Sequence, residues 1–211
     1  MRKQLNTNFI RSQKTIIRSI DSGSDILKES INAAGEEIGK FILEQYFLEK
    51  DSVTTPMQEK VIDFMPKVPS CVIVTTKDDF EFFGKGIARY LPNSFIGYID
   101  YEGRRGIQAL NTDISTMMLP DTKGLPINTL IVSKAVLATG CTAIHLLKTA
   151  IKEYFPKNVL IVSLFHSLQG VAELEKEAPN ADIIVVGDSD SIDEAGMLTP
   201  GVGNLDLRLK A

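Results

Sequence analysis

A short run of small and hydroxyl-bearing residues, Ala138-Thr-Gly-Cys-Thr142, has the composition of a phosphate-binding loop. It supplies two hydroxyls, one glycine that can take unusual backbone dihedrals, and several successive backbone N–H groups. The helix expected over 142–154 would direct its unpaired N–H groups and the positive end of its dipole to the same place. We therefore predict an anion site whose phosphate-binding residues are Ala138, Thr139, Gly140, Cys141 and Thr142.

The elements that must hold this loop are a buried strand before it and a helix after it. Leu130-Ile-Val132 is short, apolar and β-branched, as a central strand covered on both faces requires. A Thr-Gly-x-Thr sequence alone also fits an ordinary strand-to-helix turn, but its position between a strand and a helix favours the anion site. The loop is not a P-loop, because the Gly-x4-Gly-Lys-Ser/Thr spacing is absent.

Two segments of the chain resemble the uracil phosphoribosyltransferase family. Leu137-Ala-Thr-Gly-Cys-Thr-Ala-Ile144 is similar to the family's 5-phosphate loop, and Gly196-Met-Leu-Thr-Pro-Gly-Val-Gly-Asn-Leu-Asp-Leu-Arg208 is similar to the segment that closes over the base. The resemblance extends from about Ile127 to Arg208 and is weaker upstream, where Phe95-Ile-Gly-Tyr-Ile99 matches a family strand. It implies the type I phosphoribosyltransferase fold and transfer of 5-phosphoribosyl from phosphoribosyl diphosphate to uracil, which yields UMP and pyrophosphate.

The resemblance implies a base-binding segment over 188–211, which we call the hood. Main-chain groups of this irregular, glycine-rich segment would meet the edge of a pyrimidine, with Met197 where the family has Tyr. Asn204 stands in place of a family Asp and removes one negative charge. The resemblance assigns base binding to Met197, Leu198, Gly201, Gly203 and Asn204.

The ribose and pyrophosphate subsites depart from the family pattern. Ser133-Lys134 replaces an acid and a proline, of which the acid binds the ribose hydroxyls, so a charge-assisted contact is lost. Lys134 would contact phosphate or point to water. The family's Arg-Ala-Gly loop is replaced by Val74-Thr-Thr-Lys-Asp-Asp-Phe80, whose two carboxylates would either hold Mg2+ or weaken the subsite. The ribose and pyrophosphate candidates are Ser133, Lys134, Lys77, Asp78 and Arg104, of which the arginine equally fits a solvated loop charge.

Two functions stay open, and no residue is assigned a catalytic role. The first is that of a uracil phosphoribosyltransferase of pyrimidine salvage, with Mg2+ bound together with the diphosphate donor. The second is that of a non-catalytic relative, which binds a nucleoside monophosphate or another phosphate ligand in a regulatory or partner-binding role. Cys141 replaces the family's second glycine and is read as neutral, the alternative being a reactive thiol at a helix N-terminus.

The composition of the chain narrows the class of protein. Its 211 residues, 44% of them hydrophobic, suffice for one well-buried domain. A net charge of -4 argues against a nucleic-acid partner and leaves small molecules or protein partners. Among small molecules, the family resemblance implies a nucleotide or a base. Cys71 and Cys141 lie in or beside predicted buried strands, so no disulfide is expected and a cytoplasmic location fits. No metal-ligand spacing surrounds His145 or His166, and no apolar run has membrane length.

The N-terminal residues 1–21 are basic, with no acid before Asp21. An organelle transit peptide is one interpretation. The other is an N-terminal arm that lies on an acidic body or on a partner subunit, aided by its apolar residues Phe9, Ile10, Ile16, Ile17 and Ile20.

Strands that alternate with helices predict an α/β domain with a parallel sheet and right-handed crossovers. Helices are expected over about 22–48, 78–90 and 168–177, and a loop around Asp51 and Pro56. The predicted strands are 71–76, 95–99, 130–132, 158–163 and 183–187.

The pattern loses its regularity over 100–126, which predicts a projecting arm or hairpin. The resemblance places this segment over the active site or at a dimer contact. Its apolar pieces, among them Met117-Met-Leu119, would be exposed to solvent in a monomer, so we predict a homodimer. The alternative is that the segment is a lid that packs on its own domain.

Overall fold

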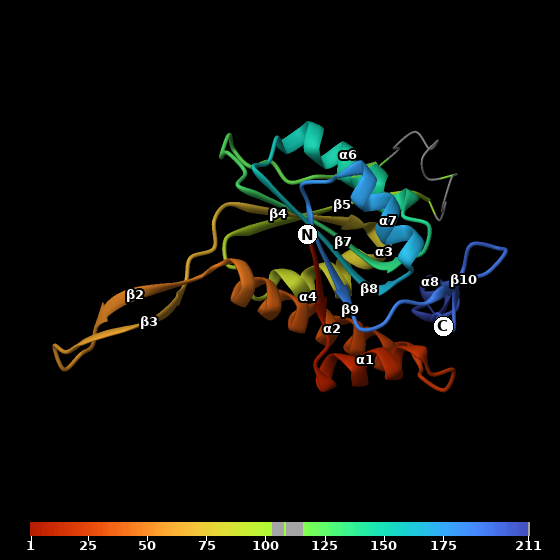
Figure 1. Cartoon of the computed structure of the whole chain (residues 1–211), viewed down its shortest axis with the longest axis horizontal. Helices are drawn as coiled ribbons and strands as arrows, with labels where there is room; N and C mark the ends of the chain where they lie inside the picture. Colours follow the sequence, from red (N-terminus) through yellow and green to blue (C-terminus); the bar gives the residue numbers. More distant parts are fainter. Residues whose placement is uncertain (103–107, 109–115, 211) are drawn as a thin grey trace.

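The computed structural model describes residues 1–102, 108 and 116–210, which form an α/β fold around one large sheet (Figure 1). Among these residues the sheet has seven strands in the order β1-β9-β8-β7-β4-β5-β6. Every neighbouring pair is parallel except β5 with β6. The predicted α/β fold with a mostly parallel sheet is therefore confirmed. In sheet order the strands are Arg2–Leu5, Asp182–Val186, Asn158–His166, Thr129–Leu137, Cys71–Thr76, Ser94–Asp100 and Thr116–Met118.

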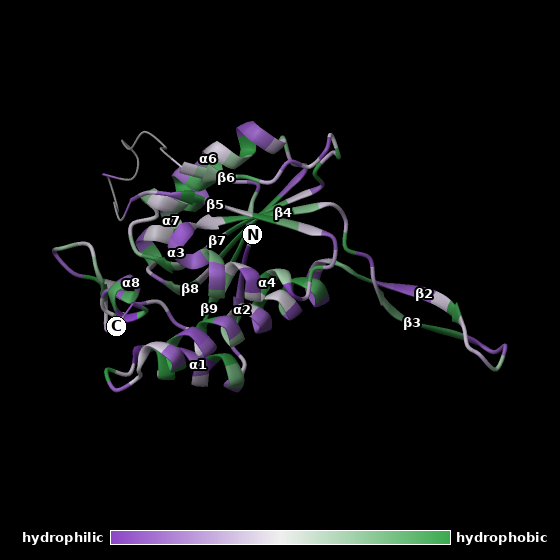
Figure 2. Ribbon diagram, turned by 180° about the vertical axis from the view of Figure 1, so that it is seen from behind, coloured by the Kyte–Doolittle hydropathy of each residue, from purple (hydrophilic) through white to green (hydrophobic). Residues whose placement is uncertain are grey.

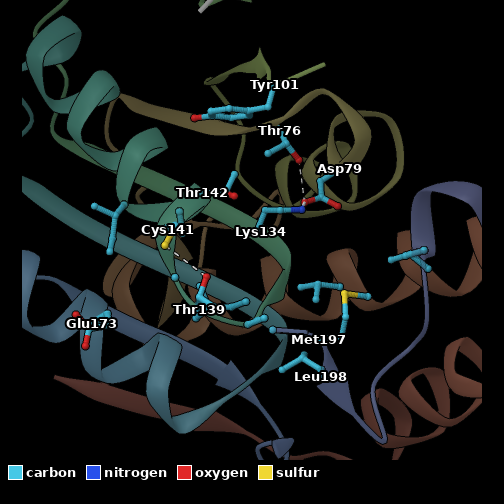
Figure 3. Close-up of a pocket in the computed structure, with 18 of the residues that line it drawn as sticks. Thr76, Asp79, Tyr101, Lys134, Thr139, Cys141, Thr142, Glu173, Met197 and Leu198 are labelled. Carbon is cyan, nitrogen blue, oxygen red and sulfur yellow. Dashed lines mark hydrogen bonds and ion pairs between the residues drawn. The ribbon is translucent and has the colours of Figure 1, made fainter. Parts of the chain in front are cut away.

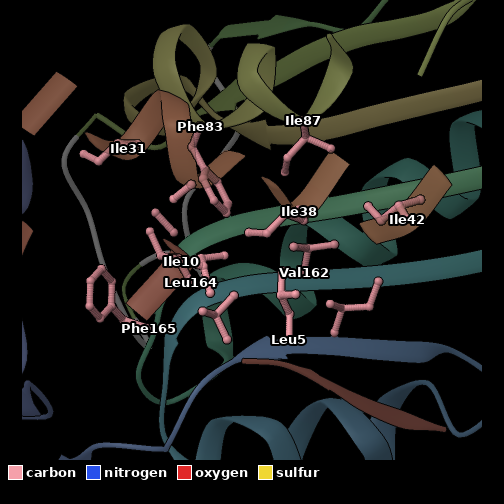
Figure 4. Close-up of a cluster of buried hydrophobic side chains, with 14 of the residues drawn as sticks. Leu5, Ile10, Ile31, Ile38, Ile42, Phe83, Ile87, Val162, Leu164 and Phe165 are labelled. Carbon is pink, nitrogen blue, oxygen red and sulfur yellow. The ribbon is translucent and has the colours of Figure 1, made fainter. Parts of the chain in front are cut away.

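Both faces of the sheet are covered by helices, and successive strand residues pack on opposite faces. Ile73 and Ile131 belong to one buried cluster, part of which Figure 4 shows with Ile38 of α2 near Val162 of β8. Val72 and Leu130, one position away, belong to the other cluster. Helices α1 (Asn8–Arg18), α2 (Ser24–Tyr46) and α4 (Lys85–Ala88) cover the first face, and α6 (Cys141–Tyr154) and α7 (Leu168–Glu177) cover the second (Figure 1).

The chain between β4 and β5 is helical, as predicted, but its helix is not uniform. A short α3 (Lys77–Asp79) leads into a π-helical turn, η1 (Phe80–Gly84), and then into α4. Helix α2 lies very close to this segment, because a Cβ atom added to Gly35 would come within 2.6 Å of the Phe83 carbonyl oxygen. The glycine thus permits the close approach of α2 to η1 and α4.

The N-terminal residues form regular structure. Strand β1 adds to the edge of the sheet, parallel to β9, and the terminal amino group lies 2.9 Å from a carboxylate oxygen of Asp182. Helix α1 buries Ile10 and Ile17 completely, whereas Phe9 and Ile20 stay exposed. The expected N-terminal arm is therefore a strand and a helix that pack on the body of the same chain.

The element that projects from the body is a β-hairpin, which the sequence interpretation treated as a loop. Strands β2 (Leu48–Thr54) and β3 (Lys60–Pro66) pair antiparallel and extend away from the sheet (Figure 1). Their side chains are mostly exposed on both faces, so the alternating pattern that reveals a half-buried strand is absent. Figure 2 shows hydrophobic residues along β3.

Most of the arm predicted over 100–126 lies outside the described residues. Its described piece, 116–118, forms β6, which pairs with β5 at the edge of the main sheet. Met117 and Met118 are exposed there. This piece is therefore an edge strand of the body.

The hood has little regular structure of its own. It contains a two-residue pair, β10 (Ser191–Ile192) with β11 (Leu198–Thr199), a cis peptide bond before Pro200, and the single turn α8 (Leu205–Arg208). Across the described part of the chain, none of the helices combines the length and the hydrophobicity that a membrane span requires.

Candidate functional site

A pocket of about 860 Å³ opens at the carboxyl ends of the central strands (Figure 3). Thr76 at the end of β4, Tyr101 just after β5 and Leu137 at the end of β7 line it. The first turn of α6 and the hood complete the wall. This edge is where open parallel sheets bind their ligands, because the loops that follow the strands converge there.

The predicted phosphate loop lies in the wall of the pocket along its whole length, 138–142. Gly140 has φ of +85° and serves as the N-cap of α6, so the chain turns sharply from the loop into the helix. The Thr139 hydroxyl donates to the Cys141 sulfur over 3.4 Å. Beneath the loop, the Ser167 hydroxyl donates to the Ala138 carbonyl oxygen over 2.6 Å. A 14-residue helix thus points its N-terminus at the pocket from a supported loop.

A buried carboxylate, that of Asp79, holds the lysine of the pocket. Asp79 is 6% exposed, and its Oδ2 atom accepts three hydrogen bonds: from Lys134 Nζ over 2.5 Å, from the Thr76 hydroxyl over 3.1 Å and from the Ala135 backbone N–H over 3.1 Å. Figure 3 shows Asp79 and Lys134 facing each other across the sheet edge. Lys134 therefore lines the pocket as one partner of an ion pair.

The neighbouring Asp78 also lines the pocket, and its environment disfavours the charged form. Burial, and next the nearby carboxylate of Asp206 in the hood, raises the pKa of Asp78 above its ordinary value. Two further charged residues of the lining form an ion pair, since Lys148 lies 2.7 Å from Glu177. Along the described lining, carboxylates outnumber ammonium groups, and both lysines have acidic partners.

The structure does not bring Ser133 to the pocket. Strand β7 continues to Leu137, beyond the predicted end at Val132, and alternation places Ser133 on the same face as Ile131 and Ala135. Its side chain is fully buried, and its hydroxyl has no hydrogen-bond partner among the described residues. Ser133 is therefore removed from the ribose candidates.

Two other candidates also lie elsewhere. The Lys77 ammonium lies 2.7 Å from the Asp100 carboxylate, and the side chain, 55% exposed, is outside the pocket lining. Arg104 falls outside the described residues. Of the five ribose and pyrophosphate candidates, the described pocket wall therefore includes Lys134 and Asp78.

The hood contributes part of its predicted base-binding set. Met197, Leu198 and Gly203 line the pocket, whereas Gly201 and Asn204 do not. Gly201 has φ of +57° and turns its carbonyl oxygen toward α1, and the Asn204 side chain caps α8 by accepting from the Leu207 N–H over 3.3 Å. Both residues shape the hood.

Several lining residues were not among the predicted site residues. Thr76 is the last residue of β4 and Tyr101 directly follows β5, positions that predict a ligand-binding edge once the sheet is recognised. Burial raises the pKa of the Tyr101 phenol well above its ordinary value, and the ring lies 5.5 Å from that of His145. Residues on helices and in the hood gave no local signal: Lys148, Gln169, Glu173, Glu177, Val202, Leu205 and Asp206.

The chain is similar in sequence to known uracil phosphoribosyltransferases. The chain is 28% identical over 159 residues to the uracil phosphoribosyltransferase of Natronomonas pharaonis. This aligned region covers 72% of this chain and 70% of that protein. It is 24% identical over 197 residues to the uracil phosphoribosyltransferase of Methanococcus maripaludis strain S2, covering 93% and 83%. The solved structure of the AQ2163 protein from Aquifex aeolicus shares the fold, with a TM-score of 0.82 at 22% identity over 99% of this chain and 97% of that chain.

A family-level comparison is broader still, since the family model described as uracil phosphoribosyltransferase matches residues 4–209. The match contains the phosphate loop, the Asp79–Lys134 pair and most of the hood, which together form the pocket. The chain therefore belongs to the uracil phosphoribosyltransferase family.

Proposed function

We propose that the protein is a uracil phosphoribosyltransferase, which transfers 5-phosphoribosyl from phosphoribosyl diphosphate to uracil and releases UMP and pyrophosphate. One observation carries the proposal: a single pocket joins the phosphate loop 138–142 to the hood residues 197, 198 and 203. A nucleotide carries a phosphate and a base, and this one pocket offers residues for each of the two groups.

In the proposed reaction, the bond from the ribose C1 to the pyrophosphate oxygen breaks and a bond from C1 to a uracil ring nitrogen forms, with loss of the proton from that nitrogen. The loop 138–142 would hold the 5-phosphate with backbone N–H groups and the Thr139 and Thr142 hydroxyls. Lys134, the cation of this wall, would face anionic oxygens of the donor. Positioning and electrostatic stabilisation would then supply most of the acceleration.

The family chemistry implies Mg2+, and the residues present fit a shared site. Among the described residues, no group of three or more His, Cys, Asp or Glu side chains is arranged to hold a metal. Mg2+ accepts one or two carboxylates together with substrate phosphates, and the pocket offers the carboxylates of Asp78 and Asp206, of which the second disfavours the charge of the first. These two residues would hold the ion, which would neutralise the departing pyrophosphate.

A second function is favoured by the charge of the pocket. Lys134 is paired with Asp79, Lys148 is paired with Glu177, and Asp78 faces the same space. This arrangement suits a monophosphate better than a diphosphate donor, because each added negative charge meets the surplus of carboxylates. We therefore keep a non-catalytic relative that binds a nucleoside monophosphate such as UMP as the alternative.

Product analysis separates the two functions. The protein is incubated with phosphoribosyl diphosphate, Mg2+ and a panel of bases, and nucleotides are resolved by chromatography. Formation of UMP from uracil, lost in a Thr139→Ala, Thr142→Ala double variant, is expected for the enzyme. Calorimetric titration completes the test: if UMP binds at micromolar concentration while the donor binds no more tightly with Mg2+ and no product forms, the enzyme proposal is wrong and the alternative stands.

We also propose that the protein is a homodimer, and the hairpin supports this. Ile62 is 72% exposed and Phe64 is 58% exposed on an element that has little contact with its own body. Sedimentation is expected to give a dimer at tens of micromolar, and an Ile62→Ser, Phe64→Ser double variant to shift it toward monomer. Phe155→Ser, which alters an 80% exposed side chain at the end of α6, is the matched control. A monomeric parent protein would contradict the proposal.

A cytoplasmic location is proposed on the chemistry of the thiols. Cys71 is buried and Cys141 is half-buried, and neither forms a disulfide. Free thiols persist in a reducing compartment. A fluorescent fusion confined to an organelle would contradict this location.

A further inference from the structure

Helix α1 and the hood are joined by an arginine that α1 contributes. Arg18, at the end of α1, donates to both carboxylate oxygens of Asp190, over 2.7 and 3.0 Å, and to the Gly201 carbonyl oxygen over 2.7 Å. Its guanidinium also lies 4.9 Å from the centre of the Phe165 ring. Asp190 is 8% exposed, so the bidentate ion pair between Arg18 and Asp190 is largely shielded from solvent.

A second arginine makes the reciprocal connection from the hood. Arg208 donates to the carbonyl oxygens of Ile17, over 2.7 Å, and Ser19, over 2.5 Å, at the end of α1. The same guanidinium donates to the Val202 carbonyl oxygen over 2.9 Å, inside the hood. The two arginines therefore link the end of α1 to both the beginning and the end of the hood.

The hood depends on such outside contacts, because its own structure is slight. Its regular elements are two two-residue strands and one helical turn. Short elements with few internal hydrogen bonds open easily unless neighbours hold them. Yet Leu198, Val202 and Leu205 of this segment line the same pocket as the phosphate loop.

We propose that Arg18 and Arg208 are positioning residues, through which α1 sets the conformation of the base side of the pocket. Neither side chain lines the pocket, so both act through the hood. The functional part of the proposal rests on the proposed nucleotide site. The structural part, that α1 holds the hood, stands independently of any ligand.

The hydrogen bonds that the two arginines form determine which substitutions test the proposal. Lysine keeps the charge of Arg18 but cannot form the planar bidentate contact while also reaching a carbonyl oxygen, so Arg18→Lys is expected to restore part of what Arg18→Met loses. Arg11, exposed on the same helix, forms no hydrogen bond to the hood among the described residues, and Arg11→Met is the matched control. Arg208→Met tests the second link.

Two measurements test the proposal. Hydrogen exchange followed by mass spectrometry is expected to rise over 188–209 in Arg18→Met and Arg208→Met, by about tenfold or more, with exchange in β7 and α6 unchanged. Calorimetry is expected to show UMP bound roughly tenfold to hundredfold more weakly, with ribose 5-phosphate, which lacks a base, bound as in the parent protein. Arg18→Lys should lie between, and Arg11→Met should match the parent protein.

Unchanged exchange over the hood in both arginine-to-methionine variants would overturn the proposal, as would equal weakening of UMP and ribose 5-phosphate. If the parent protein binds neither ligand, the proposed nucleotide site is wrong, and the exchange measurement still decides whether α1 holds the hood. If Arg18→Met unfolds, as raised exchange in β7 would show, Arg18→Lys decides the question: its hood exchange must exceed that of Arg11→Met.

Discussion

Replacing Asp79 by asparagine tests how the pocket balances charge against stability. The change keeps the size of the side chain and one carbonyl oxygen, which can still accept from the Thr76 hydroxyl or the Ala135 N–H. It removes the negative charge that faces Lys134. The variant therefore separates the hydrogen-bonding role of Asp79 from its electrostatic role.

The expected loss of stability follows from the burial of the pair. Removing one partner of a fully buried ion pair costs about 3–5 kcal/mol. Lys134 retains 18% exposure, so water stabilises its ammonium group in part, and the asparagine oxygen preserves part of the hydrogen bonding. We expect the free energy of unfolding to fall by about 2 kcal/mol, which lowers the melting temperature of a chain of this length by about 4–8 °C.

The expected effect on ligand binding has the opposite sign. Without Asp79, Lys134 carries an uncompensated positive charge into the pocket. At a dielectric constant close to that of water, one unit charge about 4 Å away changes the energy of an anion by about 1 kcal/mol, so inorganic phosphate and UMP should bind about fivefold more tightly. The gain should shrink as salt is added, because the interaction is screened.

Thermal unfolding and calorimetric titration at two salt concentrations measure both effects. Asp78→Asn is the control: it also removes a carboxylate from the pocket, but one whose raised pKa shows that the folded protein disfavours its charge. It should tighten anion binding without lowering the melting temperature. The reasoning fails if Asp79→Asn leaves the melting temperature unchanged, or if it weakens phosphate binding while the protein remains folded.

Three further changes have definite expected outcomes. Thr142→Ala should weaken UMP and the diphosphate donor alike by about fivefold in titrations, since it removes one hydroxyl of the shared loop, and Thr142→Ser should restore binding. Lys134→Ala should weaken the donor more than UMP if the ammonium meets pyrophosphate, and equal weakening would place it at the 5-phosphate. Burial, and to a smaller extent the charge of Lys14, lowers the pKa of His166 from 6.5 to about 4 in the folded protein. As the pH falls from about 6.5 to 4, His166 is therefore protonated in the unfolded chain before it is in the folded protein, and the folded protein loses stability. Denaturant titrations should show that the free energy of unfolding falls less between pH 6.5 and 4 in His166→Gln than in the parent protein, by on the order of 3 kcal/mol. If the free energy of unfolding depends on pH equally in both proteins, His166 is not the origin of the loss.

The parts of the site that the sequence predicts well are those whose signal is local. The loop 138–142 lies between a strand and a helix in the chain itself, so residue types and order suffice to place it, and the structure brings the whole loop into the pocket. The central strands are equally local signals, because each is a short apolar run. By contrast, β2 and β3 have exposed residues on both faces, and no alternation marks them.

The contacts that tune the site are not local, and a sequence pattern does not contain them. Asp79 and Lys134 are 55 positions apart and meet because β4 and β7 are neighbours in the sheet. Arg18 and Asp190 are 172 positions apart and meet because α1 packs beside the hood. Such pairs become predictable once the strand order is known, since that order determines which loops converge.

The reassignment of Ser133 shows how the length of one strand changes the chemistry of a site. A strand that ended at Val132 would leave Ser133 and Lys134 in a loop, both free to face a ligand. Because β7 continues to Leu137, its alternation sends the hydroxyl into the core and the ammonium toward the pocket. The pocket therefore has a cation, Lys134, where the family pattern has a proline, while Ser133, at the position of the family's acid, is buried. The carboxylate that balances the cation comes from Asp79, beyond the end of the adjacent strand. The negative charge at this wall of the pocket is thus supplied from α3, which directly follows β4, and Asp79 and Lys134 both line the space that a ligand would fill.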